Sequence, residues 1–191
     1  LDRLIAIACN ELSGQLEIKP ELLKDVRDFI VDRLRGYYRD QGHGAELINA
    51  ALASSWDTLP DLDKRLRALS AFMGQDEAAS LAASNKRIGN ILRKTEDAFS
   101  REINEELFIF EEERVLFDEI NRLEEAVLPL LEQGDYENSL RLLSGLKEPV
   151  DAFFDAVMVM DDDLALRLNR RSLLSNLKLL FDRIGDLSVL A

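Results

Sequence analysis

The chain has 191 residues, 47% of them hydrophobic, and its 24 Lys and Arg against 37 Asp and Glu give a formal net charge of −13. This length allows one large domain or two small ones, and so acidic a chain is not expected to bind nucleic acid or anionic membranes through its overall charge. Its single cysteine, Cys9, excludes an internal disulfide and a cysteine-based zinc site, which fits a reducing, cytoplasmic location.

Helices are expected in the first half of the chain. The opening stretch LDRLIAIACNELSGQL has an amphipathic pattern without an initiating Met, so we expect the chain to be a piece of a longer protein. Residues 20–42 repeat apolar side chains at helical spacing, with Pro20 in the first turn and Gly42 at the end. Thr58 or Asp61 should cap a helix over residues 58–74, and another should cover residues 76–94.

The second half also has helical periodicity. One long helix is predicted over residues 105–133, two shorter ones over 136–146 and 148–157, and a last one over about 162–187, capped by Asp161 to Asp163. The alternating segment VMVM at 157–160 is too short to carry a sheet, and its methionines are expected to fill the core. The fold class is therefore predicted to be all-α, a helical bundle.

Charge is segregated along the chain. Residues 96–125 contain twelve acids against three Arg, a net charge of −9, whereas residues 81–94 and 165–181 contain no acid and carry +4 each. The cations of the two basic segments are Lys86, Arg87, Arg93 and Lys94, and Arg167, Arg170, Arg171 and Lys178. A basic stripe beside an apolar one suits a helix that contacts phosphates. It is also what a solvated helix surface shows, and runs of charge are more often solvated faces than binding sites.

Catalytic chemistry is not indicated. The only histidine, His43, lies in the glycine-flanked loop DQGHG, and no glycine-rich phosphate loop is present. The acidic runs EEER and DDD are simpler to explain as solvated or helix-capping groups than as metal ligands. We therefore expect no catalytic residue, no metal and no cofactor in this chain.

Three stretches, DFIVDRLRGYYRDQG (28–42), ASNKRIGNILRK (83–94) and a long one over 149–190, resemble the C-terminal region of the β subunit of the bacterial two-subunit glycyl-tRNA synthetase. That region is similar to the all-helical anticodon-binding domain named for an Asp-Ala-Leu-Arg motif. Here Leu164 to Arg167 keep the Ala-Leu-Arg part, and Asp163 stands one position earlier as a helix-capping acid.

The resemblance implies a non-catalytic piece of an α2β2 enzyme that attaches glycine to its tRNA with ATP, the active site lying on the α subunit. The partners would be glycine tRNA, the rest of the β subunit and the α subunit, without a membrane. A helical segment over residues 1–95 would precede an anticodon-binding bundle over 96–191, or the two would form one continuous domain.

A tRNA-binding role needs phosphate contacts, stacked bases and base readers. The candidates are Arg33, Arg35, Tyr38, Lys86, Arg87, Arg93, Lys94, Arg167, Asn169, Arg170, Arg171 and Lys178. Asp161 to Asp163 and Asn169 are expected to read the two anticodon cytosines, because cytosine offers an amino donor to an acid. Tyr37, beside Tyr38, either stacks on a base or packs in the core.

A rival hypothesis makes the chain a helical scaffold domain. The acidic segment 96–125 would then be the working surface, and the basic helices would be merely solvated. If RNA binds instead, the acidic segment should face away from it, because like charges repel.

Overall fold

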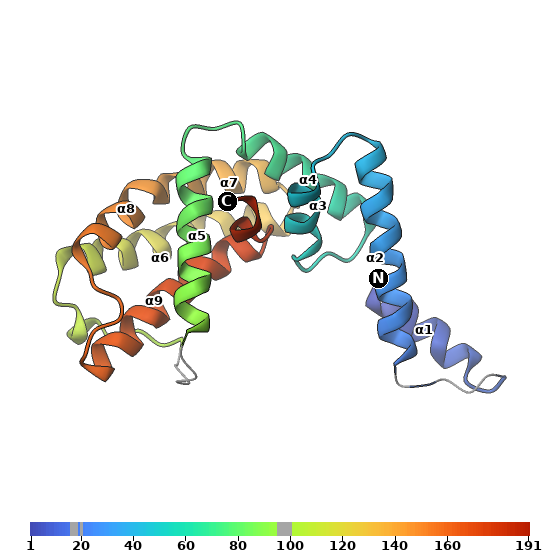
Figure 1. Ribbon diagram of the computed structural model, residues 1–191, viewed down its shortest axis with the longest axis horizontal. Helices are drawn as coiled ribbons and strands as arrows, with labels where there is room; N and C mark the ends of the chain where they lie inside the picture. The colour runs from blue at the N-terminus through green and yellow to red at the C-terminus, as the bar shows by residue number, and fades with distance from the viewer. Residues whose placement is uncertain (16–18, 20, 95–100) are drawn as a thin grey trace.

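The computed structural model describes residues 1–15, 19, 21–94 and 101–191, and Figure 1 shows that they form an elongated helical molecule. Among these residues the regular elements are α-helices and short 3-10 helices, so the all-α prediction is confirmed. In chain order they are α1 (Asp2–Leu12), α2 (Leu22–Asp40), α3 (Ala45–Leu52), α4 (Leu59–Phe72), α5 (Ala78–Arg93), η1 (Glu105–Leu107), α6 (Glu111–Glu132), α7 (Tyr136–Leu143), η2 (Ser144–Leu146), α8 (Lys147–Ala156), α9 (Leu164–Asp182) and η3 (Leu187–Leu190).

Helices α1 and α2 form one end of the molecule (Figure 1). Helix α2 buries Val31, Leu34 and Tyr38 and ends before Gly42, whose φ of 91° is the left-handed conformation that glycine adopts without strain. Pro20, expected in the first turn of this helix, lies outside the described residues. Helix α3 was not expected from the sequence, because it is short and its N-cap residue, Gly44, provides no side-chain cap.

Helix α4 begins as expected. The Thr58 side chain accepts a hydrogen bond from the Asp61 backbone N–H at 3.3 Å, and Pro60 stands in the first turn, where its missing N–H is harmless. The helix buries Leu62, Leu66, Leu69 and Phe72. Of the two predicted caps, Thr58 is the one that acts.

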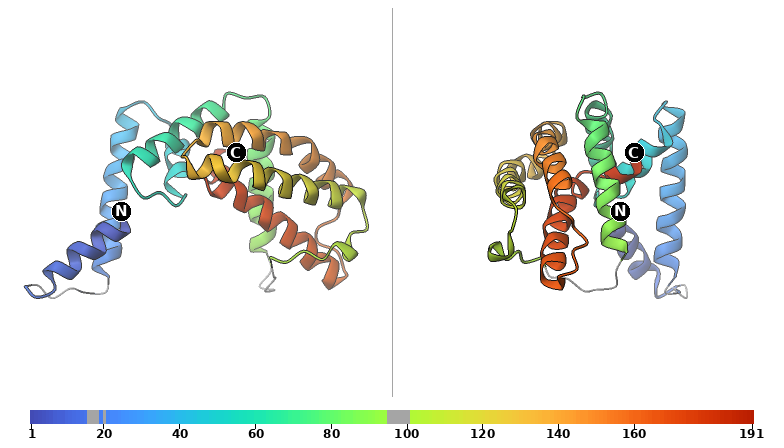
Figure 2. Two further views of the ribbon diagram at one scale, coloured as in Figure 1. Left: turned by 180° about the vertical axis from the view of Figure 1, so that it is seen from behind. Right: turned by 60° about the vertical axis from the view of Figure 1, so that its left-hand side comes forward.

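Helices α5 to α9 form the other end of the molecule. Helices α8 and α9 both pack against α5 on one side and α6 on the other, and the left view of Figure 2, seen from behind, shows α6 in front and α5 at the back of the bundle. The buried apolar residues form one cluster that runs from Val31 to Leu187. Residues from both halves of the chain therefore contribute to the same core.

The predicted helix over 105–133 is wrong at its start. Residues 105–107 form the 3-10 helix η1, and α6 begins only at Glu111. The reason is Glu113, whose buried carboxylate accepts hydrogen bonds from the backbone N–H groups of Ile109 at 2.9 Å and Phe110 at 3.0 Å. These contacts hold the chain extended before the first helical turn.

The last helix is also shorter than predicted. It ends at Asp182, and η3 follows it. A Cβ atom on Gly185 would lie 2.6 Å from Leu69 Cδ1, so the chain passes too close to α4 for a side chain there. At the other end of α9 the capping prediction is confirmed, because the Asp163 carboxylate accepts from the backbone N–H groups of Ala165 and Leu166.

Candidate nucleic-acid interface

Helix α5 separates its apolar side from its cations. Its buried residues are Ala78, Leu81, Ala82, Asn85, Ile88 and Gly89. The four cations of the predicted basic segment, Lys86, Arg87, Arg93 and Lys94, are exposed. This division follows the helical period, which places residues three and four apart on the same face. The cations of α5 are therefore available to a ligand.

The segment Val157–Met160 faces the cations of α5. Val157 and Val159 are 3% and 5% exposed, whereas Met158 and Met160 are 71% and 38% exposed. Burial thus alternates along the segment, so the valines anchor it and the methionines project from it. The expectation that Met158 and Met160 fill the core is therefore wrong.

A groove with a volume of about 700 Å³ lies between these two walls. The described residues that line it are Ala83, Lys86, Arg87, Asn90, Ile91, Lys94, Val157, Met158, Val159, Met160 and Ala191, and none of them has a carboxylate side chain. We call it the basic groove. The Arg87 guanidinium lies 4.0 Å from the centre of the Phe154 ring, and Lys86 Nζ donates to the backbone oxygen of Ala191 at 2.6 Å. Both contacts orient cations of α5 along the groove.

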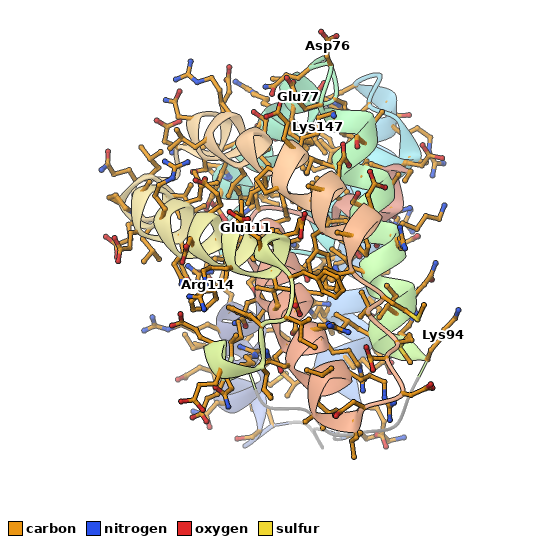
Figure 3. The ribbon with its side chains drawn as sticks, turned by 90° about the vertical axis from the view of Figure 1, so that its left-hand side faces the viewer. Asp76, Glu77, Lys94, Glu111, Arg114 and Lys147 are labelled. Carbon is orange, nitrogen blue, oxygen red and sulfur yellow. The ribbon has the colours of Figure 1, made fainter. Side chains whose placement is uncertain are left out.

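The basic groove and the acidic helix α6 lie on different sides of the bundle. Figure 3 shows Lys94 at the end of α5 on one side, and Glu111 and Arg114 at the start of α6 on the other. Helices α8 and α9 pack between the two. Several acids of the predicted acidic segment are already paired, for example Glu105 with Arg114 at 2.8 Å. Glu96 and Asp97 of that segment lie outside the described residues.

A buried arginine holds the segment Val157–Met160, which we call the methionine segment, in place. Arg170 Nη1 donates to the backbone oxygen of Met158 at 3.0 Å and to Asp161 Oδ2 at 2.7 Å, while Arg170 Nε donates to Glu113 Oε1 at 2.8 Å. Hydrogen bonds from the Asp163 backbone N–H and from Arg170 lower the pKa of the Asp161 carboxyl. This network ties the segment to both α9 and α6.

Three predicted RNA contacts on α9 are not available to a ligand. Arg170 and Arg171 are each 1% exposed, and Asn169 is also buried. The Asn169 amide is used by Asn104, accepting from its backbone N–H at 2.8 Å and donating to its backbone oxygen at 3.0 Å. The structure therefore buries Arg170 and Arg171, predicted to hold phosphates, and Asn169, predicted to read a base, and none of the three lines the basic groove.

These buried arginines have structural partners instead. Arg171 Nη2 donates to the backbone oxygen of Leu92 at 3.4 Å, in the last turn of α5, where a cation is favoured by the helix dipole. Of the acids predicted to read cytosine, Asp163 caps α9 through Oδ1 and Asp161 accepts from Arg170 through Oδ2, whereas Asp162 is exposed. Arg171 thus supports the helix that carries the exposed cations.

The two remaining candidates on α9 are partly engaged. Lys178 Nζ forms ion pairs with Asp182 at 2.7 Å and Asp186 at 3.2 Å and is partly buried. Arg167 Nη1 donates to the backbone oxygen of Asp161 at 2.6 Å. Arg167 lies in the first turn of α9, next to the methionine segment, whereas Lys178 lies near the other end of the helix. Arg167 is therefore the α9 candidate nearer to the basic groove.

The candidates on α2 form a separate group. Helices α3 and α4 lie between α2 and the bundle (Figure 1), so the structure does not bring Arg33 and Arg35 to the basic groove. Tyr38 is buried and donates to Asp63 Oδ1 at 2.8 Å, and burial together with this bond raises the pKa of Tyr38. Tyr38, predicted to contact RNA, is therefore not presented at the surface, whereas its neighbour Tyr37 is exposed.

Two other kinds of site, a metal centre and a membrane span, are absent from the described residues. No three His, Cys, Asp or Glu side chains in that part of the chain lie close enough together to hold a metal ion. None of the described helices combines the length and apolar character that a membrane span requires.

Comparisons with known proteins identify the family of this chain. Residues 81–187, which include most of α5, the methionine segment and α9, match the DALR anticodon binding domain. The chain is 46% identical over 166 residues to the glycine--tRNA ligase beta subunit of Aliivibrio salmonicida (strain LFI1238), covering 87% of this chain and 24% of that protein. It is 41% identical over 180 residues to that of Glaesserella parasuis serovar 5 (strain SH0165), covering 94% and 26%. The chain thus spans about a quarter of the length of these relatives.

Proposed function

Because the chain belongs to the DALR anticodon-binding domain family, we propose that it binds the anticodon loop of glycine tRNA in the basic groove. The observation that carries this proposal is the groove itself, which places exposed cations of α5 opposite exposed apolar side chains and has no carboxylate among its described lining side chains. A single-stranded loop presents both phosphates and unstacked bases. The groove offers a complementary surface to each.

The residues proposed to contact RNA are the members of the original set that are exposed or only partly buried. Lys86, Arg87, Arg93 and Lys94 would hold phosphates of the loop, and Arg167 would extend the contact toward the start of α9. Arg33 and Arg35, with the exposed Tyr37, would meet a more distant part of the tRNA. Lys178, already neutralised by two aspartates, would contribute least.

The complete protein is proposed to be the β subunit of a cytoplasmic two-subunit glycine--tRNA ligase. The names of its relatives, which are glycine--tRNA ligase beta subunits, support this role. In an α2β2 assembly the segment would position glycine tRNA, and ATP-dependent attachment of glycine would occur on the α subunit. The segment itself would bind no cofactor and perform no chemistry.

Binding of the 191-residue chain to a fluorescent anticodon stem-loop of glycine tRNA, followed by anisotropy at salt concentrations from about 50 to 200 mM, tests the proposal. Each single-strand phosphate contact contributes about −0.7 to the slope of log K against log salt, so three or four contacts give roughly −2 to −3. Lys86→Ala and Lys94→Ala should each weaken binding and reduce the magnitude of the slope by about 0.7.

Arg93 and Arg141 provide a matched comparison. Both are exposed, and each donates to an asparagine three residues earlier, Arg93 to Asn90 at 2.6 Å and Arg141 to Asn138 on α7. Arg93→Ala should weaken RNA binding, whereas Arg141→Ala should not. Equal losses in the two variants, or no RNA binding by the unmodified chain, would refute the proposed function and favour the scaffold hypothesis.

A further inference from the structure

The two exposed methionines of the segment 157–160 have no packing role that explains them. Met158, at 71% exposure, is the most exposed of the large apolar side chains in the described parts of the chain, and both methionines line the basic groove. Exposed apolar side chains that gather at a groove commonly mark a binding surface. Methionine is suited to such a surface, because its flexible thioether adapts to flat aromatic partners.

The backbone that carries these methionines is firmly held. Val157 N–H donates to the Phe153 backbone oxygen at 2.9 Å, which closes the end of α8, and Arg170 donates to the Met158 backbone oxygen at 3.0 Å. The buried valines 157 and 159 fix the segment on either side of Met158. The Met158 side chain is therefore presented from a fixed backbone, and binding need not first order the segment.

The opposite wall limits which ligand fits. Lys86, Arg87 and Lys94 supply positive charge, and no described lining side chain supplies a carboxylate. A ligand must therefore offer anionic groups toward α5 and a flat or apolar group toward Met158. Single-stranded RNA offers phosphates along its backbone and an unstacked base on each sugar, and proteins bind it by holding both at once.

Resting on the proposed function, we propose that Met158 and Met160 form a methionine platform that receives an unstacked base of the RNA loop. The cations of α5 hold the phosphates beside that base. Contact with a thioether depends on the face of the base and not on its hydrogen-bonding edge, so the platform contributes affinity for any base at that position. Base identity would be read by other groups.

The experiment pairs variants of the 191-residue chain with modified RNAs. The RNAs are the anticodon stem-loop and three versions in which one anticodon base at a time is replaced by an abasic sugar. Met158→Gln should weaken binding to the intact loop by about three- to tenfold, and Met158→Leu should restore most of it. The slope of log K against log salt should not change in either variant, because no phosphate contact is lost.

The decisive result is the coupling between protein and RNA changes. If one base lies on the platform, Met158→Gln has no further effect on the RNA that lacks this base and keeps its effect on the other two. Leu142→Gln, at an exposed apolar residue of α7 that does not line the groove, serves as the control and should not alter binding. Thermal unfolding of each variant confirms that it is folded.

Three results would overturn the inference. Salt-sensitive RNA binding that Met158→Gln leaves unchanged, or weakens equally for all four RNAs, would refute the platform and leave the proposed function standing. Absence of RNA binding by the unmodified chain would refute both. Binding of a labelled acidic peptide rich in Glu and Leu to the unmodified chain but not to Met158→Gln, with RNA binding the same in both, would assign the surface to a protein partner.

Discussion

Glu113 and Arg170 form an ion pair in the core, with Arg170 Nε and Glu113 Oε1 2.8 Å apart and each side chain 1% exposed. The pair joins α6 to α9, and its two residues are 57 positions apart in the sequence. Through the further bond of Arg170 to the Met158 backbone oxygen, the same pair supports one wall of the basic groove. Stability and the shape of the candidate site therefore depend on one contact.

Removing one partner of this pair should be strongly destabilising. Glu113→Ala leaves the Arg170 charge buried and unpaired on that side and also removes the acceptor for two backbone N–H groups, so we expect a loss of about 3–5 kcal/mol in the free energy of unfolding. Urea denaturation measures it. Glu119→Ala, which breaks the exposed pair with Arg122, should cost less than about 1 kcal/mol. Similar losses in the two variants would show that the buried pair has no special role.

Stability should fall in acid partly because of Asp161. The pKa of this carboxyl is lower in the folded chain than in the unfolded chain, where it is about 3.9. Its ionised form therefore stabilises the fold at pH above that value, and the stabilisation is lost as the pH falls through the folded pKa. Asp161→Asn should be less stable near neutral pH and lose less stability on acidification. Parallel pH curves of unfolding free energy for the two proteins would contradict this.

The N-cap of α9 can be tested without touching the groove cations. Asp163→Ala removes the acceptor for the Ala165 and Leu166 backbone N–H groups and should cost about 0.5–2 kcal/mol. Asp163→Ser, which keeps a capping oxygen, should retain most of the stability in a thermal unfolding experiment. If serine is no better than alanine, the carboxylate acts in some way other than capping. Discrimination between anticodons should be the same in both variants, because the helix uses this carboxylate.

Two glycines should respond to alanine in opposite directions. At Gly185 a Cβ would lie 2.6 Å from Leu69 Cδ1 and 3.1 Å from the Ala50 backbone oxygen, so Gly185→Ala should destabilise the fold by about 1–3 kcal/mol. At Gly36, inside α2, nothing lies within 4 Å, and Gly36→Ala should stabilise by roughly 0.5–1 kcal/mol. Unfolding free energies from urea titrations decide both. Equal effects would mean that α4 and the chain at Gly185 are less closely packed than described.

The residues by themselves determined the helices and their caps. The period of Leu62, Leu66 and Leu69 and the Thr58 cap predict α4, and the run Asp161 to Asp163 predicts a cap for α9, which Asp163 provides. These features are local, since a hydrogen bond to a neighbouring N–H or a contact one turn away depends only on nearby residues. The acid-free face of α5 is likewise visible in the sequence. The division into residues 1–95 and 96–191 stays a prediction, since residues 95–100 are outside the described parts of the chain.

Tertiary structure alone decided which cations and which apolar residues face the solvent. The sequence does not distinguish Arg167 from Arg170. Arg170 is nevertheless buried in α9, where it pairs with Glu113 of α6, a residue 57 positions away in the sequence. The apolar side chains of Met158 and Met160 predict core residues, but Val157 and Val159 are the buried members of this segment and the methionines are exposed. A central helix is covered from several sides, so its periodicity cannot reveal which polar residue finds a buried partner. That choice depends on contacts between segments far apart in the sequence, and it placed the candidate site on α5 and the methionine segment instead of on α9.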